Sequence, residues 1–270
     1  QRPKDSSTNW AQGGIAAILD KTNLEEIDGH IKDTLDAGDG LCDETVVRMV
    51  VEEAGERIQD LLSIGVEFER GKDGHFQLAK EGGHSSRRIL HAKDATGKEI
   101  ERALTTAAAA HDRIKLRPNT LAIDLIQREH RMPEKGVCGV WALDQETNEV
   151  LTIQGDAVVL ATGGAGQLWE KTTNPSVSTG DGIAMAYRTG ASITNMAFVQ
   201  FHPTALVVEG GRPFLITEAL RGEGAVLLDH EGYREWKASG EDDPRSFSFT
   251  LQALSLIHIC RCRRPMVWWW

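Results

Sequence analysis

The sequence has few cysteines, few aromatic residues and no long apolar run. Its four cysteines are scattered over 270 residues, and Cys260 and Cys262 have no second pair of ligands near them. This pattern is typical neither of a disulfide framework nor of a zinc site, so we expect no bound metal. There is no apolar run of about 18 residues that could span a membrane, and the N-terminal residues lack the layout of a signal peptide. We therefore expect a cytoplasmic protein.

Basic residues are also scarce relative to acidic ones. The 40 acidic residues outnumber the 30 basic residues, and the formal net charge is −10. Such a surplus argues against a nucleic-acid or anionic-membrane partner, because both of these are themselves negative. The content of hydrophobic residues, 40%, and of charged residues, 26%, is ordinary for a globular protein. Any site for an anionic ligand must then be locally basic.

Two segments have the apolar spacing of packed helices. Residues 46–64 carry an apolar stripe, with Asp43 as a plausible N-cap and Gly65 at the end. Residues 99–111 predict a second helix. Between the two helices, residues 71–94 are polar and rich in glycine, which is typical of loops that carry functional residues.

From residue 114 the apolar spacing changes to a period of two. This predicts a small meander inserted in a larger domain, with strands at residues 115–117, 121–127, 137–143 and 149–154. Residues 156–161 are apolar after Asp156 and lead into a Thr-Gly-Gly turn. They predict a buried parallel strand that ends near a cofactor. A Gly-Asp-Gly sequence at 180–182 then opens a predicted helix at 183–189.

A later stretch places polar side chains in apolar surroundings. His202 precedes Pro203, which biases the histidine towards an extended conformation. Thr217, Glu218 and Arg221 follow, and one helical turn would bring Glu218 to Arg221. A satisfied core histidine beside a surface ion pair would give the same pattern. The residues around this stretch favour a functional interpretation.

Several blocks of sequence resemble one flavoprotein family. FVQFHPTAL at 198–206 and FLITEALRGEGA at 214–225 resemble its substrate-site blocks, and the family contains succinate dehydrogenase and fumarate reductase flavin subunits and L-aspartate oxidases. Further blocks resemble those of the family and follow in the same order along the chain. They are SSTNWAQGGIAA at 6–17, EGGHSSRRILHAKDATG at 81–97, VVLATGGAG at 158–166 and TNPSVSTGDGIAMAYRTGA at 173–191. The resemblance covers nearly all of residues 6–245.

Glu81 indicates which branch of this family the chain resembles. The respiratory members carry a phenylalanine before the two glycines, whereas EGGHS followed by RRILHA resembles the L-aspartate oxidases. A carboxylate here would receive the ammonium of an amino acid, which succinate lacks. The alternative is a solvated loop acid. A respiratory flavin subunit, the second reading, would need a histidine for covalent flavin attachment within residues 6–14, which contain none.

The resemblance implies flavin-dependent oxidation of L-aspartate to iminoaspartate, with hydride transfer from Cα to flavin N5. This reaction would be the first step of de novo NAD biosynthesis via quinolinate. FAD would be bound non-covalently, and oxygen or fumarate would accept the electrons. A functional link to quinolinate synthase is also implied, whereas neither nucleic acid nor a membrane is an expected partner.

By the same resemblance, His202 and Thr217 bind a substrate carboxylate and Glu81 faces the ammonium. Glu218 and Arg221 continue as a polar chain behind them. His202, Thr217, Glu218 and Arg221 all belong to the implied catalytic set.

Arg245 completes this catalytic set. It lies in an Asp-Pro-Arg motif that matches the proton-transferring arginine of the family. A guanidinium has a pKa above about 12, so a simple carboxylate clamp remains the alternative role.

The implied flavin contacts are mostly small residues, because a planar ligand must lie against the backbone. The matching positions are Ser7, Thr8, Ala11, Gln12, Gly13, Gly14, Ala122, Ile123, Thr162, Gly163, Gly164 and Asp181. The Gln-Gly-Gly match is the most specific of these. Ala122 and Ile123 fit ordinary strand residues equally well.

The implied fold class is α/β. Residues 1–195 would form an incomplete glutathione-reductase-like FAD-binding domain, and residues 196–245 the start of an inserted α+β capping domain. No Gly-x-Gly-x-x-Gly motif precedes Ser6, so we expect the first βαβ unit to be missing and the chain to be inactive alone. Residues 246–270 resemble translated adapter DNA and are expected to be a non-native tail; a divergent natural tail is the alternative.

Overall fold

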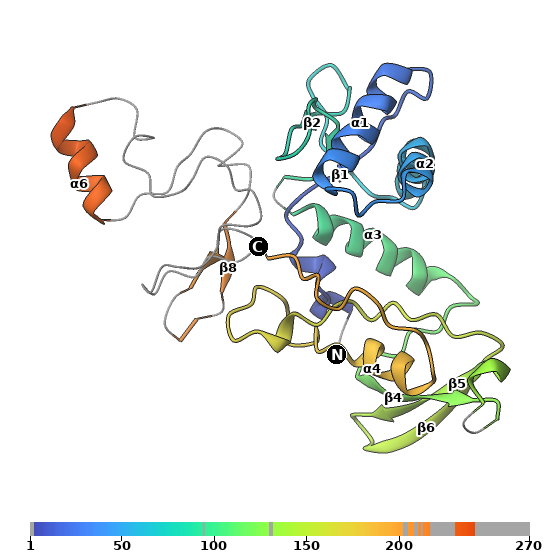
Figure 1. Cartoon of the computed structure of the whole chain (residues 1–270). Coiled ribbons are helices and arrows are strands. Elements are labelled where there is room, and N and C mark those ends of the chain that lie inside the picture. The colour runs from blue at the N-terminus through green and yellow to red at the C-terminus, as the bar shows by residue number, and fades with distance from the viewer. Residues whose placement is uncertain are drawn as a thin grey trace.

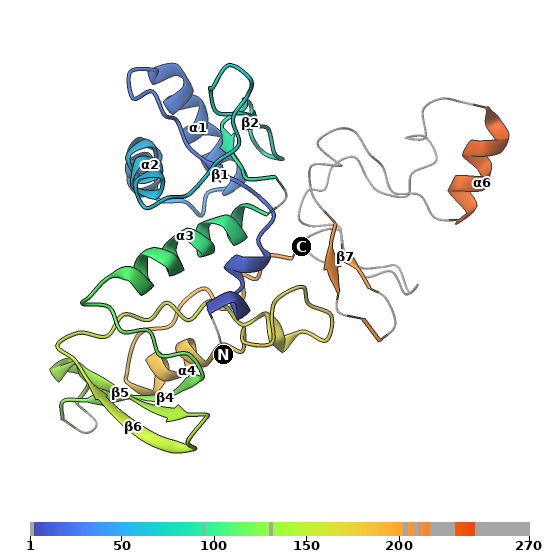
Figure 2. The same ribbon diagram turned by 180° about the vertical axis from the view of Figure 1, so that it is seen from behind.

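The structure is a computed structural model. It describes residues 3–93, 95–129, 132–201, 205–207, 210–211, 213–216 and 230–240. Figure 1 shows the helices α1 and α2 with a small sheet at one end, α3 in the middle, and a second sheet at the other end. The hairpin β7 and β8 and the helix α6 lie to one side, and the view from behind in Figure 2 agrees.

The first helices follow from local capping signals. α1 (Leu24–Ala37) begins after Asn23, whose side chain accepts a hydrogen bond from the backbone of Glu26. α2 (Glu44–Ser63) begins after Asp43, whose side chain accepts from the backbone of Thr45 and Val46. Gly65, with a φ of +92°, turns the chain away after α2. The predicted helix at 46–64 and its caps are confirmed, whereas α1 was not predicted.

A three-stranded antiparallel sheet lies beside these helices. It consists of β1 (Ile15–Ala16), β2 (Leu78–Ala79) and β3 (Ile89–Leu90), with β3 in the centre. The main core forms where this sheet meets α2 and α3 (Thr96–Ala110). Its buried members are Ala17, Ile58, Val66, Phe68, Leu90 and Ala103. The predicted second helix is thus confirmed, and it begins three residues earlier than expected.

The second sheet is the predicted meander. β4 (Thr120–Gln127), β5 (Val137–Asp144) and β6 (Glu149–Gln154) pair antiparallel in sequence order. Asp144 caps the β5–β6 turn by accepting hydrogen bonds from the next backbone amides. Three of the four predicted strands are therefore confirmed. Residues 115–117 form no strand, because none of the described strands pairs with them.

The predicted buried strand at 156–161 is wrong. These residues form no strand, and Val159 is 87% exposed. A parallel strand is stable only between neighbours that satisfy its backbone groups and cover its faces. None of the described strands pairs with this segment. The helix predicted after it is confirmed as α4 (Asp181–Arg188).

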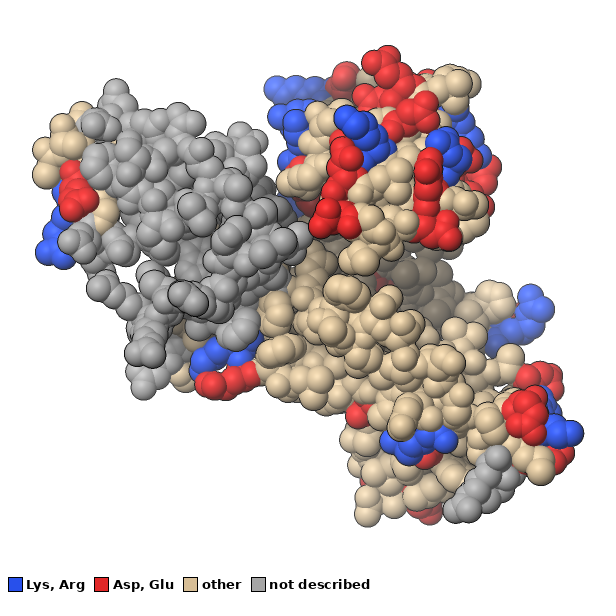
Figure 3. Space-filling view, in the orientation of Figure 1, with Lys and Arg blue, Asp and Glu red and all other residues tan. Residues whose placement is uncertain are grey.

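The remaining described elements are short. They are η1 (Pro3–Asp5), η2 (Thr8–Trp10), η3 (Pro133–Lys135), η4 (Gly166–Leu168), β7 (Ala205–Leu206), β8 (Phe214–Leu215) and α6 (His230–Ser239). Within the described ranges, no helix has the length and apolar character needed to cross a membrane. Figure 3 shows charged side chains crowded over the end that carries α1 and α2, whereas the middle of this face has few.

Candidate functional site: a glycine-rich loop and its supports

The loop at residues 6–14 is held by segments far away in sequence. The hydroxyls of Ser7 and Ser178 are hydrogen-bonded at 3.0 Å, and Ser178 is 2% exposed. The backbone amide of Gly97, at the start of α3, donates to the carbonyl of Ala11 at 3.0 Å. A Cβ atom on Gly97 would overlap the carbonyl oxygen of Thr8 and approach Ala11. Thr8 and Ala11, two of the predicted flavin-contact residues, are therefore packed against the N-terminus of α3, and Ser7 contacts Ser178.

The close approach at Gly97 gives a prediction. Gly97→Ala should displace the loop that carries Thr8 and Ala11, because backbone atoms cannot yield as a flexible side chain can. We expect a loss of about 1–3 kcal/mol in the free energy of unfolding and weaker FAD binding. Chemical denaturation and flavin titration would measure these effects. Lys98→Ala, at the neighbouring exposed position of α3, should change neither. An unchanged affinity for FAD in Gly97→Ala would contradict this packing role.

Gln12 has one amide atom engaged and one without a partner. Its Nε2 donates to the carbonyl of Leu215 on β8 at 3.2 Å. Its Oε1 and the Oγ of Ser6 are buried and have no hydrogen-bond partner among the described residues. Buried polar atoms normally find a partner. This loop therefore offers unsatisfied polar atoms to a ligand that carries donors and acceptors of its own.

Glu81 reaches the same loop from the opposite side. Its Oε1 accepts a hydrogen bond from the backbone amide of Gly14 at 3.1 Å. Its Oε2 lies 3.5 Å from the position that a Cβ atom would take on Gly13. A Cβ atom on Gly14 would overlap Ile89 and Leu90 of β3. The structure thus brings Glu81 beside Gly13 and Gly14.

The segment that follows Glu81 contains a buried arginine. Arg88 is 2% exposed, and its Nη1 lies 2.6 Å from Oδ2 of Asp33 on α1. The guanidinium also donates to the hydroxyls of Ser85 and Ser86. Burial alone would raise the pKa of Asp33, but hydrogen bonds from the Ser85 amide, Arg88 and the Ser85 hydroxyl hold it well below its ordinary value.

Two histidines flank this arginine. The rings of His30 and His84 lie 5.5 Å apart. Desolvation, followed by the charge of Arg88, lowers the pKa of His30 to about 4 and also lowers the pKa of His84. Both rings are therefore neutral at neutral pH. Neither Arg88 nor Asp33 was singled out from sequence, although the arginine lies inside the EGGHS…RRILHA block.

The predicted adenine-end residues lie at an irregularity of β4. The register of β4 with β5 shifts between Ala122 and Asp124, so Ile123 has no partner in the ladder. Arg188, at the end of α4, donates to the carbonyl of Ile123 at 3.2 Å and to Asp124 at 2.9 Å. Ile123 is 42% exposed. Arg188 thus occupies the carbonyl of Ile123, outside the β4–β5 ladder, and it is a support that sequence reasoning missed.

The other predicted glycine-rich residues surround the start of α4. Thr179 donates to Asp181 at 2.8 Å, and Asp181 is exposed in the first turn of the helix. A Cβ atom on Gly182 would overlap the side chain of Thr162. Gly163 and Gly164 have no described atom within 4 Å of their Cβ positions. The turn therefore has open space beside Gly163 and Gly164, whereas Gly182 is tightly packed.

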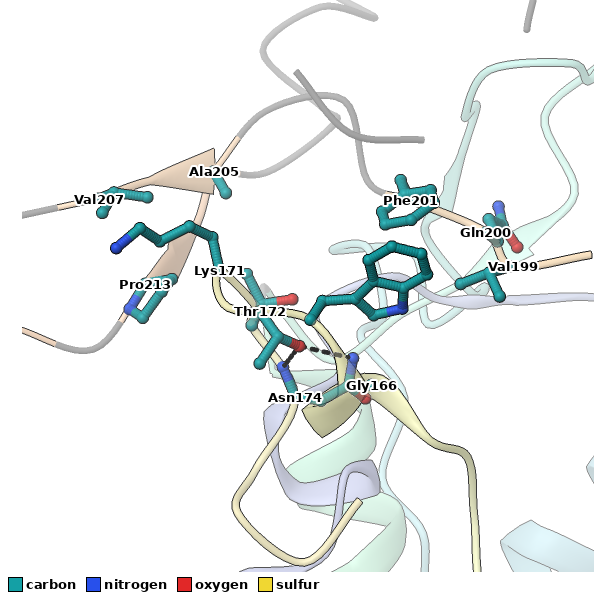
Figure 4. Close-up of a pocket in the computed structure, with 12 residues that line it drawn as sticks. Gly166, Lys171, Thr172, Asn174, Val199, Gln200, Phe201, Ala205, Val207 and Pro213 are labelled. Carbon is teal, nitrogen blue, oxygen red and sulfur yellow. Dashed lines mark hydrogen bonds between the residues drawn. The ribbon is translucent and has the colours of Figure 1, made fainter. Parts of the chain in front are cut away.

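The structure also has a hollow between this region and the segment that leads to His202. It is lined by Gly166, Trp169 and residues 171–174 on one side, and by residues 199–201, 205, 207 and 213 on the other. The rings of Trp169 and Phe201 meet edge to face at 4.8 Å. Figure 4 shows Phe201 above Thr172 and Asn174, whose side chains are hydrogen-bonded. The predicted catalytic residues lie outside the described residues: His202, Thr217, Glu218, Arg221 and Arg245.

The fold and this site define a flavin-nucleotide-binding domain. The chain belongs to the FAD binding domain family, whose model matches residues 1–246. Its cofactor is FAD, and the open glycine turn and the unpartnered Gln12 Oε1 fit such a group. Gly163 and Gly164 would accommodate the planar part of the cofactor, whereas Gln12 would offer it a hydrogen-bond acceptor.

Among curated proteins, the chain is similar to L-aspartate oxidases. It is 48% identical to chloroplastic L-aspartate oxidase 2-a of Nicotiana tabacum, over 86% of this chain and 37% of that protein. It is 45% identical to L-aspartate oxidase of Yersinia pestis, over 89% of this chain and 46% of that protein. The chain thus spans less than half the length of these two relatives.

Two solved structures are similar to most of this chain. A quinol-fumarate reductase with menaquinol molecules superposes with a TM-score of 0.77 and 32% identity, over 88% of this chain and 40% of that chain. The Mycobacterium smegmatis Sdh1 complex in the apo form gives a TM-score of 0.73 and 32% identity, over 85% of this chain and 40% of that chain. Identity is higher to the L-aspartate oxidases than to these respiratory proteins.

Proposed function

We propose that the complete protein oxidises L-aspartate to iminoaspartate with non-covalently bound FAD. The observation that carries this proposal is the position of Glu81, a carboxylate that lies beside the glycine-rich loop at Gly13 and Gly14. When bound, FAD supplies the acceptor for the hydride that leaves the substrate Cα. The similarity to L-aspartate oxidases over most of the chain supports the same reaction.

The residues of this chain would act by orientation and charge. Glu81 binds the substrate ammonium, and its hydrogen bond to the Gly14 amide fixes one carboxylate oxygen. His202 and Thr217 bind a carboxylate of the substrate, and Glu218 and Arg221 support them. Arg245 moves the proton or clamps the second carboxylate. Succinate has no ammonium, so the carboxylate of Glu81 favours an amino-acid substrate.

The wider assignment follows from the same resemblance. We propose a glutathione-reductase-like FAD-binding domain at 1–195, a capping domain that starts at 196–245, and a non-native tail at 246–270. Oxygen or fumarate is the proposed electron acceptor. The functional link to quinolinate synthase and the cytoplasmic location stay predictions, and the plant relatives carry the word chloroplastic in their names.

Glu81→Gln tests the proposed substrate. In the complete protein, this change should lower turnover of L-aspartate far more than reduction of fumarate, because only the former substrate has an ammonium. Loss of a charge-assisted hydrogen bond costs about 1.5–3 kcal/mol, so we expect a loss of roughly tenfold to a hundredfold in kcat/KM. Steady-state kinetics with both substrates measure this difference. Equal losses would refute the role of Glu81 in binding the ammonium.

Lys80→Gln is the matched control. Lys80 is the exposed neighbour of Glu81, and its ammonium donates to the carbonyl of Ser85 at 3.0 Å. Lys80→Gln also removes a charge from the same loop, but the side chain of Lys80 does not reach Gly14. Both activities should stay within about twofold of the unchanged protein, as expected for an exposed substitution.

A further inference from the structure

We propose that Arg88 is a positioning residue that holds the Glu81 carboxylate at Gly14, where the substrate ammonium would bind. This inference rests on the proposed function of Glu81. The two residues belong to one hairpin, since residues 80–88 connect β2 to β3. Glu81 lies near the start of this connection and Arg88 at its end, directly before Ile89.

The guanidinium of Arg88 turns back into its own loop. Its Nη2 donates to Ser86 Oγ at 2.8 Å and to Ser85 Oγ at 3.2 Å, and its Nε donates to Ser86 Oγ at 3.2 Å. Its Nη1 lies 3.3 Å from Nδ1 of His84. A neutral His84 accepts this bond, in agreement with its lowered pKa. One side chain therefore contacts three consecutive residues of the loop.

The same guanidinium ties the loop to α1. Asp33 accepts from Nη1 at 2.6 Å and also accepts from the backbone amide and the hydroxyl of Ser85. Glu26 accepts from Ser86 Oγ at 2.7 Å and lies 3.7 Å from Nη2 of Arg88. The positive charge is thus compensated by two carboxylates. These contacts anchor the loop to α1, and one face of α1 is itself buried.

The backbone at Arg88 continues this anchor to the glycine-rich loop. The carbonyl of Arg88 accepts from the amide of Ala17 at 3.0 Å, and Ile15 pairs with Leu90. Gly14, directly before β1, then donates to Glu81. The segment 14–17 is therefore held at one end by Arg88 and at the other by Glu81.

The loop needs such an anchor. Gly82 and Gly83 are exposed, and Gly83 has a φ of +82°, so the backbone beside Glu81 has unusual conformational freedom. Without contacts that fix the loop, Glu81 would sample many positions and bind an ammonium less often. Arg88 supplies these contacts through a planar group with five donors, a geometry that lysine cannot reproduce.

Arg88→Lys in the complete protein provides the test. We expect KM for L-aspartate to rise about tenfold, with fumarate reduction changed less than about twofold. In the same variant, hydrogen exchange at the Gly14 amide should accelerate by about tenfold or more, because its bond to Glu81 is made less often. Ser86→Ala, which removes one acceptor of the guanidinium, should move both measurements in the same direction by a smaller factor.

Arg48→Lys is the matched control. Arg48 lies on α2 with a half-exposed side chain and pairs with Asp28, Glu44 and Glu52. Arg48→Lys should leave both the KM for L-aspartate and the hydrogen exchange at the Gly14 amide unchanged. Should Arg88→Lys prevent folding, Ser86→Ala gives the same two readouts. Unchanged exchange at Gly14, or equal losses with L-aspartate and fumarate in Arg88→Lys, would overturn the positioning role.

The test separates this inference from the proposed function. A selective loss in Glu81→Gln without any effect of Arg88→Lys refutes the positioning role alone. Faster exchange at Gly14 in Arg88→Lys, together with equal losses for both substrates in Glu81→Gln, supports the contact to Glu81 and refutes the ammonium role. Selective losses in both variants support both proposals.

Discussion

Asp33→Asn is expected to lower the free energy of unfolding by about 3–5 kcal/mol at neutral pH, because it removes the nearer of the two carboxylates that compensate a buried charge. The partner is Arg88, which is 2% exposed, and the side chain of Asp33 is itself only 16% exposed. Glu26 remains, but its oxygen lies 3.7 Å from the guanidinium and its side chain is 38% exposed. Urea denaturation of the chain at pH 7 would measure the change.

The pH dependence of stability provides a second measurement on the same variant. The pKa of Asp33 is lower in the folded protein than its ordinary value of 3.8. Its contribution is therefore fully present above the unfolded value and is lost as the pH falls below about 4. The pKa of His30 is lowered from 6.5 to about 4. The free energy of unfolding therefore also decreases as the pH falls from about 6.5 to about 4. Because the charge of Asp33 also raises the pKa of His30, the difference between the unchanged protein and Asp33→Asn reports the loss of Asp33 together with this change at His30.

Asp28→Asn is the control for both measurements. Asp28 also lies on α1 and pairs with Arg48 at 3.5 Å, but its side chain is 69% exposed. An exposed pair of this kind contributes little, so we expect a change within about 0.5 kcal/mol. If Asp33→Asn were equally mild, the buried ion pair would not be the anchor that its geometry indicates.

Arg245→Leu is expected to reduce L-aspartate turnover by roughly 10²–10⁴-fold in the complete protein while FAD stays bound. The reason is the proposed assignment of Arg245 to the capping domain, whereas the glycine-rich loop and the turn at Gly163 and Gly164 are the segments proposed to hold the cofactor. Arg245→Lys should restore little activity, since an ammonium lacks the planar fork of a guanidinium. The flavin absorbance of the purified variants and their kcat measure the two effects separately.

Arg234→Leu is the control for this second change. Arg234 lies exposed on α6 and belongs to the same stretch of chain. Its replacement should leave turnover and flavin content within about twofold. Loss of FAD from Arg245→Leu, or activity close to that of the unchanged protein, would show that Arg245 has a different role.

The sequence by itself determined the elements that depend on neighbouring residues. Asp43 and Gly65 mark the ends of α2, and the period of two from residue 114 predicts the meander with its turn around residues 144–148, although the first predicted strand does not form. Capping and alternating patterns are local, because the groups that satisfy each other lie within a few positions. The Gln-Gly-Gly and EGGHS blocks likewise indicated the flavin family and Glu81 without any coordinates.

Only the tertiary structure decided how these parts meet. It joined Gly14 to Glu81 across 67 positions and Ser7 to Ser178 across 171. Among the described strands, none pairs with residues 156–161, although their apolar run predicts a buried strand. A strand needs hydrogen-bonding neighbours and a buried arginine needs a carboxylate, and both partners come from distant segments. Apolar spacing along the chain carries no information about which distant segments supply them.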